Sequence, residues 1–228
     1  MNRIPLQILR RTLSTAQPAA TTTTAASILD HALTKVPAHG WTTAAVAAAA
    51  NDLGLSPATS GLAAQPIALV EHFLNTALSC TLADADDQLH ELPTPHERLR
   101  LLCRIRLRQT MPLVDRWPEA VALLAQPQNL PRATGHLAEL ASELCYAADV
   151  RAPNLDWYAQ RSALAAAYLA TELYLCEDRS PGHELTWSFL DSRLDEIKSA
   201  RALCVGASNY ASQFSRNMYN IFASQGFK

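Results

Sequence analysis

The sequence predicts an all-α protein, and three observations lead to that fold class. Alanine and leucine dominate the 228 residues, and both lose little free energy on entering a helix. Proline and the seven glycines recur at the boundaries of apolar stripes with helical spacing. No stretch alternates β-branched and polar residues, as a half-buried strand requires. With 49% hydrophobic residues, the chain can fill the core of one domain of about nine or ten helices.

Residues 1–24 differ in composition from the rest of the chain. Arg3, Arg10 and Arg11 are basic, Ser and Thr are frequent, and Asp30 is the first acidic residue. An Arg-rich, hydroxyl-rich and acid-poor start is typical of a mitochondrial transit peptide, and the alternative is an ordinary disordered tail. We therefore divide the chain into this segment, a helical domain at residues 25–198 and a C-terminal segment at residues 199–228.

Capping residues and prolines set the expected helix boundaries. We expect helices at residues 27–36 and 44–53, a short one opened by Ser56-Pro57 and a longer one opened by Gln65-Pro66. The acidic stretch from Asp84 to Glu91 is interpreted as a solvated loop. Further helices are expected at residues 96–111, 131–146 and 155–177, after Trp117-Pro118 and after Ser180-Pro181.

Two of these helices carry distinctive patterns. Leucines and Cys103 follow one face of residues 96–111, and five arginines (Arg98, Arg100, Arg104, Arg106 and Arg108) occupy much of the remainder. Residues 162–176 are apolar nearly all round, which predicts a central buried helix. Glu172 is the exception, because a buried carboxylate needs a partner or shifts its pKa. Arg161 or a backbone donor is expected to satisfy it.

The charge pattern argues against nucleic-acid binding. The helices that meet at residues 53–56 have the proportions of a helix-turn-helix. DNA binding by that motif needs Lys and Arg side chains to neutralise phosphates. Residues 36–97 contain seven acidic residues and no Lys or Arg, and the formal net charge of the chain is −2.

The sequence also lacks the familiar catalytic and metal-binding motifs. There is no Gly-rich phosphate loop or nucleophile elbow, and the seven histidines form no ligand pair at helical spacing. His136 and Glu139 are expected to form a surface pair. The five cysteines are far apart and are interpreted as reduced, mostly buried thiols. No apolar run reaches the roughly 18–20 residues needed to cross a bilayer, which predicts a soluble or peripheral protein.

Several segments taken together resemble the accessory protein of coenzyme Q biosynthesis, the ninth Coq protein family of mitochondria. They are VPAHGWT at residues 36–42, LGLS at 53–56, WPEA at 117–120, DWY at 156–158, ATEL at 170–173, SP at 180–181 and TWSFL at 186–190. The resemblance spans residues 27–194. It implies a TetR-like fold that keeps a vestigial helix-turn-helix and encloses a lipid in its larger helical part.

The resemblance also implies a function. Family members bind isoprenoid quinone intermediates and present them to the di-iron hydroxylase that acts on demethoxyubiquinone, together with other ubiquinone-synthesis proteins. The chain would thus be a non-enzymatic accessory protein without a cofactor. It would lie peripherally on the matrix face of the mitochondrial inner membrane, and a homodimer is compatible with the resemblance.

Three groups of residues are assigned to this function. The resemblance places a partner surface at Leu144, Cys145, Asn154, Asp156, Trp157 and Tyr158, where the alternative is an aromatic anchor in the core. Leu164, Tyr168, Leu169 and Leu175 are expected to line the lipid cavity or to fill a solid core. Leu203, Tyr210, Phe214, Met218, Ile221 and Phe222 recur near helical spacing in an acid-free segment. That pattern suits an amphipathic helix lying in a membrane interface, or a last helix docked on the domain.

Two other functions compete with lipid presentation. A TetR-like regulator that senses a small ligand would share the fold, although the helix-turn-helix lacks basic residues. An enzyme with a site formed by isolated Cys, His or acidic residues, such as a di-iron site, would leave no motif in the sequence.

Overall fold

The computed structural model describes residues 20–55, 65–151 and 155–200, and within these ranges the only regular structure is helical. The helices are α2 (Ala20–Leu33), α3 (Val36–His39), α4 (Thr43–Asp52), α5 (Pro66–Leu89), α6 (Pro95–Thr110), α7 (Trp117–Leu124), α8 (Leu130–Ala147) and α9 (Leu155–Glu177). Short 3₁₀ turns follow at Met111–Arg116 and Pro181–His183, and a further helix occupies residues 184–200. The predicted all-α class is confirmed.

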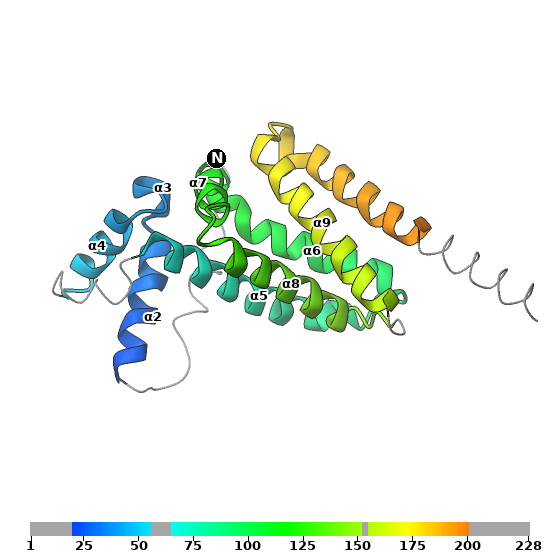
Figure 1. Ribbon diagram of the computed structural model, residues 1–228, viewed down its shortest axis with the longest axis horizontal. Helices are drawn as coiled ribbons and strands as arrows, with labels where there is room; N and C mark the ends of the chain where they lie inside the picture. Colours follow the sequence, from blue (N-terminus) through cyan, green and yellow to red (C-terminus); the bar gives the residue numbers. More distant parts are fainter. Residues whose placement is uncertain (1–19, 56–64, 152–154, 201–228) are drawn as a thin grey trace, which may run out of the picture.

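The helices form two groups that share α5 (Figure 1). Helices α2 to α4 lie at one end, and the first half of α5 and α7 complete a core with them. The second half of α5 packs with α6, α8, α9 and residues 184–200 around a larger core. Most expected boundaries lie within a few residues of the observed ones, because capping residues and prolines act locally.

The first helix ends earlier than predicted. Helix α2 ends at Leu33, and Val36 begins the separate short helix α3 with Pro37 in its first turn. Proline disfavours helical backbone at the residue before it and provides no N–H for the preceding turn. The single helix expected at residues 27–36 is therefore divided into two.

Gly40 and Glu119 hold the turn between α3 and α4 against α7. Gly40 has a φ of +66°, and a Cβ atom there would collide with the Glu119 carboxylate. That carboxylate accepts hydrogen bonds from the Trp41 backbone N–H at 3.3 Å and from Arg116 at 2.7 Å. The Trp41 ring then packs edge-on against Trp117 with a centroid distance of 5.5 Å. Two segments 78 residues apart in sequence are fixed at this point.

The acidic stretch is helical, and the expected loop there is a wrong prediction. Helix α5 continues to Leu89 because Ala77, Thr81 and Ala85 extend its buried stripe at spacings of four residues. The side chains of Asp84, Asp86 and Asp87 lie on the exposed side. Acidic residues on one side of a helix resemble a loop in composition when the buried stripe consists of small residues.

Helix α6 begins with a capping box that the prediction did not include. Thr94 Oγ1 accepts a hydrogen bond from the Glu97 N–H at 3.3 Å, and the Glu97 carboxylate accepts one from the Thr94 N–H at 3.2 Å. Arg100 and Arg104 form ion pairs with Asp191 at 3.0 and 2.7 Å. The arginine-rich part of this helix is thus partly a contact with the helix at residues 184–200.

Helix α9 is not buried all round, contrary to the prediction. It packs against α8 on one side and lies beside residues 193–200 on another. Leu164, Tyr168 and Leu175 are buried, but Leu169, Leu173 and several alanines remain exposed. An alanine-rich helix looks apolar all round in sequence, yet its small side chains do not require complete burial.

Candidate functional site: an apolar cavity with a polar floor

A cavity of about 260 Å³ lies between α5, α6, α7, α8 and α9. Most of its walls are aliphatic; the residues are Leu74, Leu78, Val121, Leu124, Leu130, Ala133, Leu137, Leu140, Leu169 and Leu173. At about 30 Å³ per water molecule, it has room for roughly nine waters. An apolar cavity with a few converging polar groups is the usual form of a site for an apolar small molecule.

The cavity has an open mouth and a closed floor. Leu130, Leu169 and Leu173 line it and are exposed to solvent, so they mark the mouth. Arg106, Tyr168 and Glu172 also line it, but their exposed fractions are only 1%, 2% and 6%. Three polar side chains therefore lie at the innermost part of the site, and the other polar lining residues (Asn75, Thr134, His136 and Glu139) are more exposed.

Arg106 is the only Lys or Arg that lines the cavity, and it is poorly satisfied. One terminal nitrogen of its guanidinium donates to Thr110 Oγ1 at 3.1 Å, and its guanidinium lies 5.4 Å from the centre of the Phe73 ring. Its Nε–H has no hydrogen-bond partner, and it makes no ion pair with a carboxylate of the described residues. Among the five arginines of this helix, position 106 thus falls on the buried side of α6.

Glu172 and Tyr168 complete the floor. The Tyr168 hydroxyl donates to Glu172 Oε1 at 3.3 Å. Burial raises the pKa of Glu172 above its ordinary value of 4.5, although Arg106, Tyr168 and Trp117 act in the opposite direction. Burial also raises the pKa of Tyr168 well above 10.0, so its hydroxyl keeps its proton. The predicted burial of Glu172 is confirmed, but Arg161 is not its partner.

The titratable and metal-ligating side chains around the site are few. No group of three or more potential ligands among His, Cys, Asp and Glu occurs in the described residues. The expected pair of His136 and Glu139 is present near the mouth, with a nitrogen–oxygen distance of 3.9 Å. The four described cysteines are free thiols, and burial raises the pKa of Cys103 to about 12. Such a thiol is a poor nucleophile.

The four residues expected to bind lipid separate into two groups. Tyr168 and Leu169 line the cavity. Leu164 instead lines a smaller cavity of about 90 Å³ beside Cys145 and Leu194, and Leu175 is packed in the solid core. The sequence analysis did not identify Arg106 or the lining residues of α8 (Ala133, Leu137 and Leu140). No sequence signal shows which face of a leucine-rich helix borders a cavity.

The residues expected to contact a partner are also only partly together. Tyr158 is 65% exposed, and Asp156 is exposed beside it. Trp157 packs against the Tyr146 ring at 5.1 Å, and the Arg161 guanidinium lies over Trp157 at 5.6 Å. Tyr146 is 68% exposed and was missed. We call Tyr146, Asp156, Trp157 and Tyr158 the aromatic surface.

Leu144 and Cys145 do not lie on the aromatic surface. Both side chains are buried in the larger core, because they follow the inner face of α8 while Tyr146 follows the outer face. Asn154 lies outside the described residues. The exposed residue of α8 beside Trp157 is Tyr146, one position after the expected Cys145.

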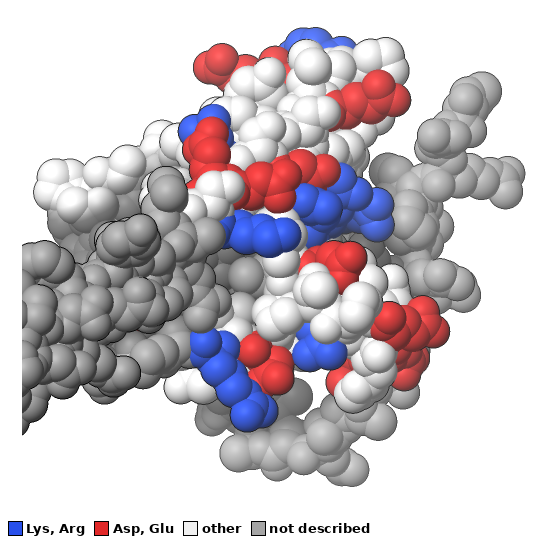
Figure 2. All heavy atoms as spheres, turned by 90° about the vertical axis from the view of Figure 1, so that its right-hand side faces the viewer, with Lys and Arg blue, Asp and Glu red and all other residues white. Residues whose placement is uncertain are grey.

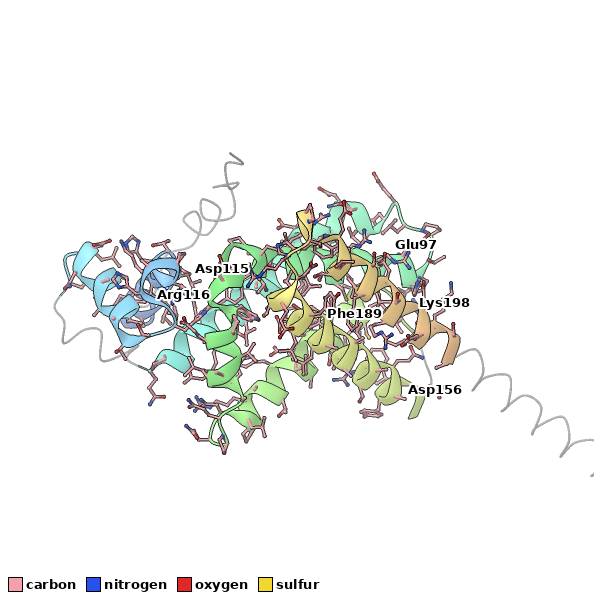
Figure 3. The ribbon with its side chains drawn as sticks, turned by 90° about the horizontal axis from the view of Figure 1, so that it is seen from above. Glu97, Asp115, Arg116, Asp156, Phe189 and Lys198 are labelled. Carbon is pink, nitrogen blue, oxygen red and sulfur yellow. The ribbon has the colours of Figure 1, made fainter. Side chains whose placement is uncertain are left out.

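The aromatic surface lies near the end of the last described helix. In Figure 3, Asp156 at the start of α9 and Lys198 near the end of the helix at residues 184–200 occupy the same end of the molecule. Figure 2 views this end and shows Lys and Arg interspersed with Asp and Glu, without a large field of one sign. This face therefore does not suit a polyanion.

Residues 1–19 of the expected transit segment and the six expected membrane-contacting residues lie outside the described residues, as does the second helix of the helix-turn-helix. Residues 20–24, which were assigned to the same segment, form the start of α2. In the part of the chain that the structure describes, no helix has both the length and the hydropathy to cross a membrane.

Comparison of the sequence with known proteins gives one consistent family. Residues 130–201 match the COQ9 family model. The chain is 35% identical over 203 residues to the Drosophila melanogaster ubiquinone biosynthesis protein COQ9, mitochondrial, which covers 86% of this chain and 62% of the relative. It is 35% identical over 178 residues to the Homo sapiens protein of the same name, with 74% and 56% covered. The chain thus spans about three fifths of the length of these relatives.

Comparison of the structures identifies the fold. A TetR transcriptional regulator from Nitrosomonas europaea superimposes with a TM-score of 0.63 at 18% sequence identity, covering 77% of this chain and 98% of the regulator. This similarity confirms the predicted TetR-like arrangement of helices and, at such low identity, concerns the fold alone. By sequence and by fold, the chain is a TetR-like member of the COQ9 family of proteins.

Proposed function

We propose that this protein acts in ubiquinone biosynthesis in mitochondria by binding an isoprenoid quinone intermediate in the cavity and presenting it to the demethoxyubiquinone hydroxylase. The cavity is the observation that carries the proposal, because it is apolar, open at one side and lined by α9, where the sequence led us to expect lipid contacts. Transfer of apolar surface from water supplies the binding free energy, at roughly 25 cal/mol per Å² buried. No covalent step is required of the protein.

The aromatic surface is the proposed contact with the hydroxylase. Exposed tyrosines and an adjacent tryptophan are typical anchors of protein interfaces. Their position at one end of α9 keeps them apart from the cavity mouth at Leu169 and Leu173. Residues 199–228 are proposed to contact the matrix face of the inner membrane, since they contain no Asp or Glu and have an amphipathic pattern.

Native mass spectrometry with lipid extraction tests cargo binding. We expect an isoprenoid or quinone to co-purify with the full chain, and Ala133→Phe to reduce its occupancy, because Ala133 lines the cavity. The matched control is Ala138→Phe, which adds the same ring to an exposed position of the same helix. Equal lipid content in all three proteins would show that the cavity is not the binding site.

Trp157→Ala tests whether the aromatic surface binds the hydroxylase independently of the cavity that binds the lipid. We expect it to weaken hydroxylase association in a pull-down and to leave lipid content unchanged, because the side chain is distant from the cavity along α9. Leu185→Ala removes an exposed apolar side chain elsewhere and is the control. Loss of bound lipid with retained association would contradict this assignment.

Deletion of residues 199–228 tests the membrane contact, and unchanged binding to liposomes would count against it. The alternative of a ligand-sensing regulator is favoured only by the TetR-like fold. A gel-shift assay separates the two functions, and we expect no shift, since residues 36–97 contain no Lys or Arg.

A further inference from the structure

We propose that the cavity binds its ligand with a neutral, oxygen-bearing head group innermost, against Arg106, Tyr168 and Glu172, and with the isoprenoid chain leaving through the mouth. This inference rests on the proposed function and adds the orientation of the ligand and the residues that select its head group. It follows from the burial, the hydrogen bonding and the charge of the three floor residues.

The floor has hydrogen-bonding capacity left for a ligand. Arg106 is 1% exposed, and among the described residues only one of its two terminal nitrogens has a hydrogen-bond partner, Thr110 Oγ1. A buried donor without a partner costs free energy, and a hydrogen bond to a charged donor is stronger than one between neutral groups. A carbonyl or hydroxyl oxygen at the floor would lie among a guanidinium, a phenol hydroxyl and a carboxyl group. A hydrocarbon chain end in the same place would add no hydrogen bond to the Arg106 guanidinium.

The volume of the cavity supports the same orientation. Room for roughly nine waters accommodates a substituted ring and the first part of a chain. A long isoprenoid chain exceeds that volume, so most of it must lie at or beyond the mouth. There it meets Leu130, Leu137, Leu169 and Leu173, which offer aliphatic contacts and no charge.

The charges that face the cavity argue for a neutral head group. Arg106 from α6 and Glu172 from α9 lie at the floor, and His136 and Glu139 from α8 lie near the mouth. The lining residues from α5 and α7 are uncharged. Arg106 and Glu172 carry opposite charges that offset each other, so a phosphorylated head group would bring negative charge that the floor does not neutralise, in a site of low dielectric constant. A quinone or phenol brings none.

The test compares two probes with the full chain by equilibrium dialysis. The first is ubiquinone with a chain of two isoprene units, and the second is the same chain without the ring. We expect Arg106→Met to lower the affinity for the quinone by about tenfold, the effect of one hydrogen bond to a charged group. Tyr168→Phe, which keeps the ring in place, should lower it severalfold. Neither variant should weaken binding of the hydrocarbon.

Leu173→Ala is the matched control, because it shortens a mouth residue and should weaken both probes alike. Thermal unfolding checks that each variant is folded. If Arg106→Met does not fold, the affinity of Tyr168→Phe for the quinone tests the orientation. Parallel losses for both probes in the floor variants, or no loss for the quinone, would overturn the head-inward orientation while leaving cargo binding intact. If the unmodified protein binds neither probe, the proposed function fails and this inference with it.

Discussion

Substitution of Asp178 should reveal how the helix at residues 184–200 is held on the domain. Asp178 follows α9 directly, and its carboxylate accepts three hydrogen bonds from the start of the next helix. Two come from Thr186, from its N–H at 2.9 Å and its hydroxyl at 2.6 Å, and one comes from the Ser180 N–H at 2.8 Å. Thr186 is completely buried, so its N–H has no access to water as a substitute partner.

The expected loss of stability can be worked out from these hydrogen bonds. A hydrogen bond to a charged group contributes about 1.5–3 kcal/mol, and a stranded buried donor costs about 1–3 kcal/mol. The three bonds share one carboxylate and are not additive, so we expect Asp178→Ala to lower the free energy of unfolding by about 2–4 kcal/mol. At about 2–4 °C per kcal/mol for a chain of this size, Tm should fall by about 4–16 °C.

Thermal and urea unfolding of the full chain, followed by circular dichroism, measure this change. Glu196→Ala is the control, because it removes an exposed carboxylate from the same helix, and the ion pair of Glu196 is with Arg193 of that helix. A loss below about 0.5 kcal/mol for Asp178→Ala, within the range of ordinary surface substitutions, would refute the reasoning.

The same contact has a pH dependence. Burial alone would raise the pKa of Asp178, but hydrogen bonds from Ser180 and Thr186 outweigh it and hold the pKa well below 3.8. The ionised carboxylate therefore stabilises the fold fully above pH 3.8, and this contribution is lost as pH falls through the lower folded-state value. Asp178→Asn should lack that dependence, so its stability deficit should shrink in acid. A deficit that is constant with pH would argue against an ionised cap.

Two further predictions concern stability. Gly40→Ala should lower the free energy of unfolding in urea by about 2–3 kcal/mol, because it combines a φ of +66° with a clash against Glu119. The control Gly54→Ala, with a φ of +67° and no atom nearby, should lower it by only about 1–2 kcal/mol. Equal losses for the two variants would contradict the clash. Glu172→Gln should gain stability relative to the unmodified protein as pH rises above 4.5, because a raised folded-state pKa means that the carboxyl's contribution is lost as pH rises through it. A stability difference that does not change with pH would show that the pKa is not raised.

Local chemistry explains which parts of the fold could be predicted. Gln65-Pro66, Trp117-Pro118 and Ser180-Pro181 all lie at observed helix starts, because proline and its neighbours restrict the backbone without help from the rest of the chain. The burial of Arg106 could not be predicted in the same way. Its environment consists of Phe73, Thr110 and Glu172, two of which come from other helices.

The contact between Gly40 and Glu119 shows a second limit. The segments at residues 36–42 and 117–120 both contributed to the family resemblance, yet nothing in either segment indicates that they touch. The structure brings them together through the Trp41 N–H and the Glu119 carboxylate. These two segments served to recognise a family. The reason why residue 40 is a glycine lies in a tertiary contact, the close approach of Glu119.

The separation of the two candidate surfaces along α9 constrains how a cargo could be presented. Fifteen residues separate Trp157 from Glu172, which at about 1.5 Å per residue places the aromatic surface roughly 22 Å from the cavity floor. In the proposed arrangement, a head group held at Arg106 lies at about that distance from the surface that docks the enzyme. Presentation must therefore include withdrawal of the head group from the floor. The floor offers a few hydrogen bonds, and the described residues hold no group of metal ligands there, so the head group can be released. Docking at the aromatic surface also leaves the mouth at Leu169 and Leu173 uncovered, so a bound partner and a bound lipid are compatible on one chain.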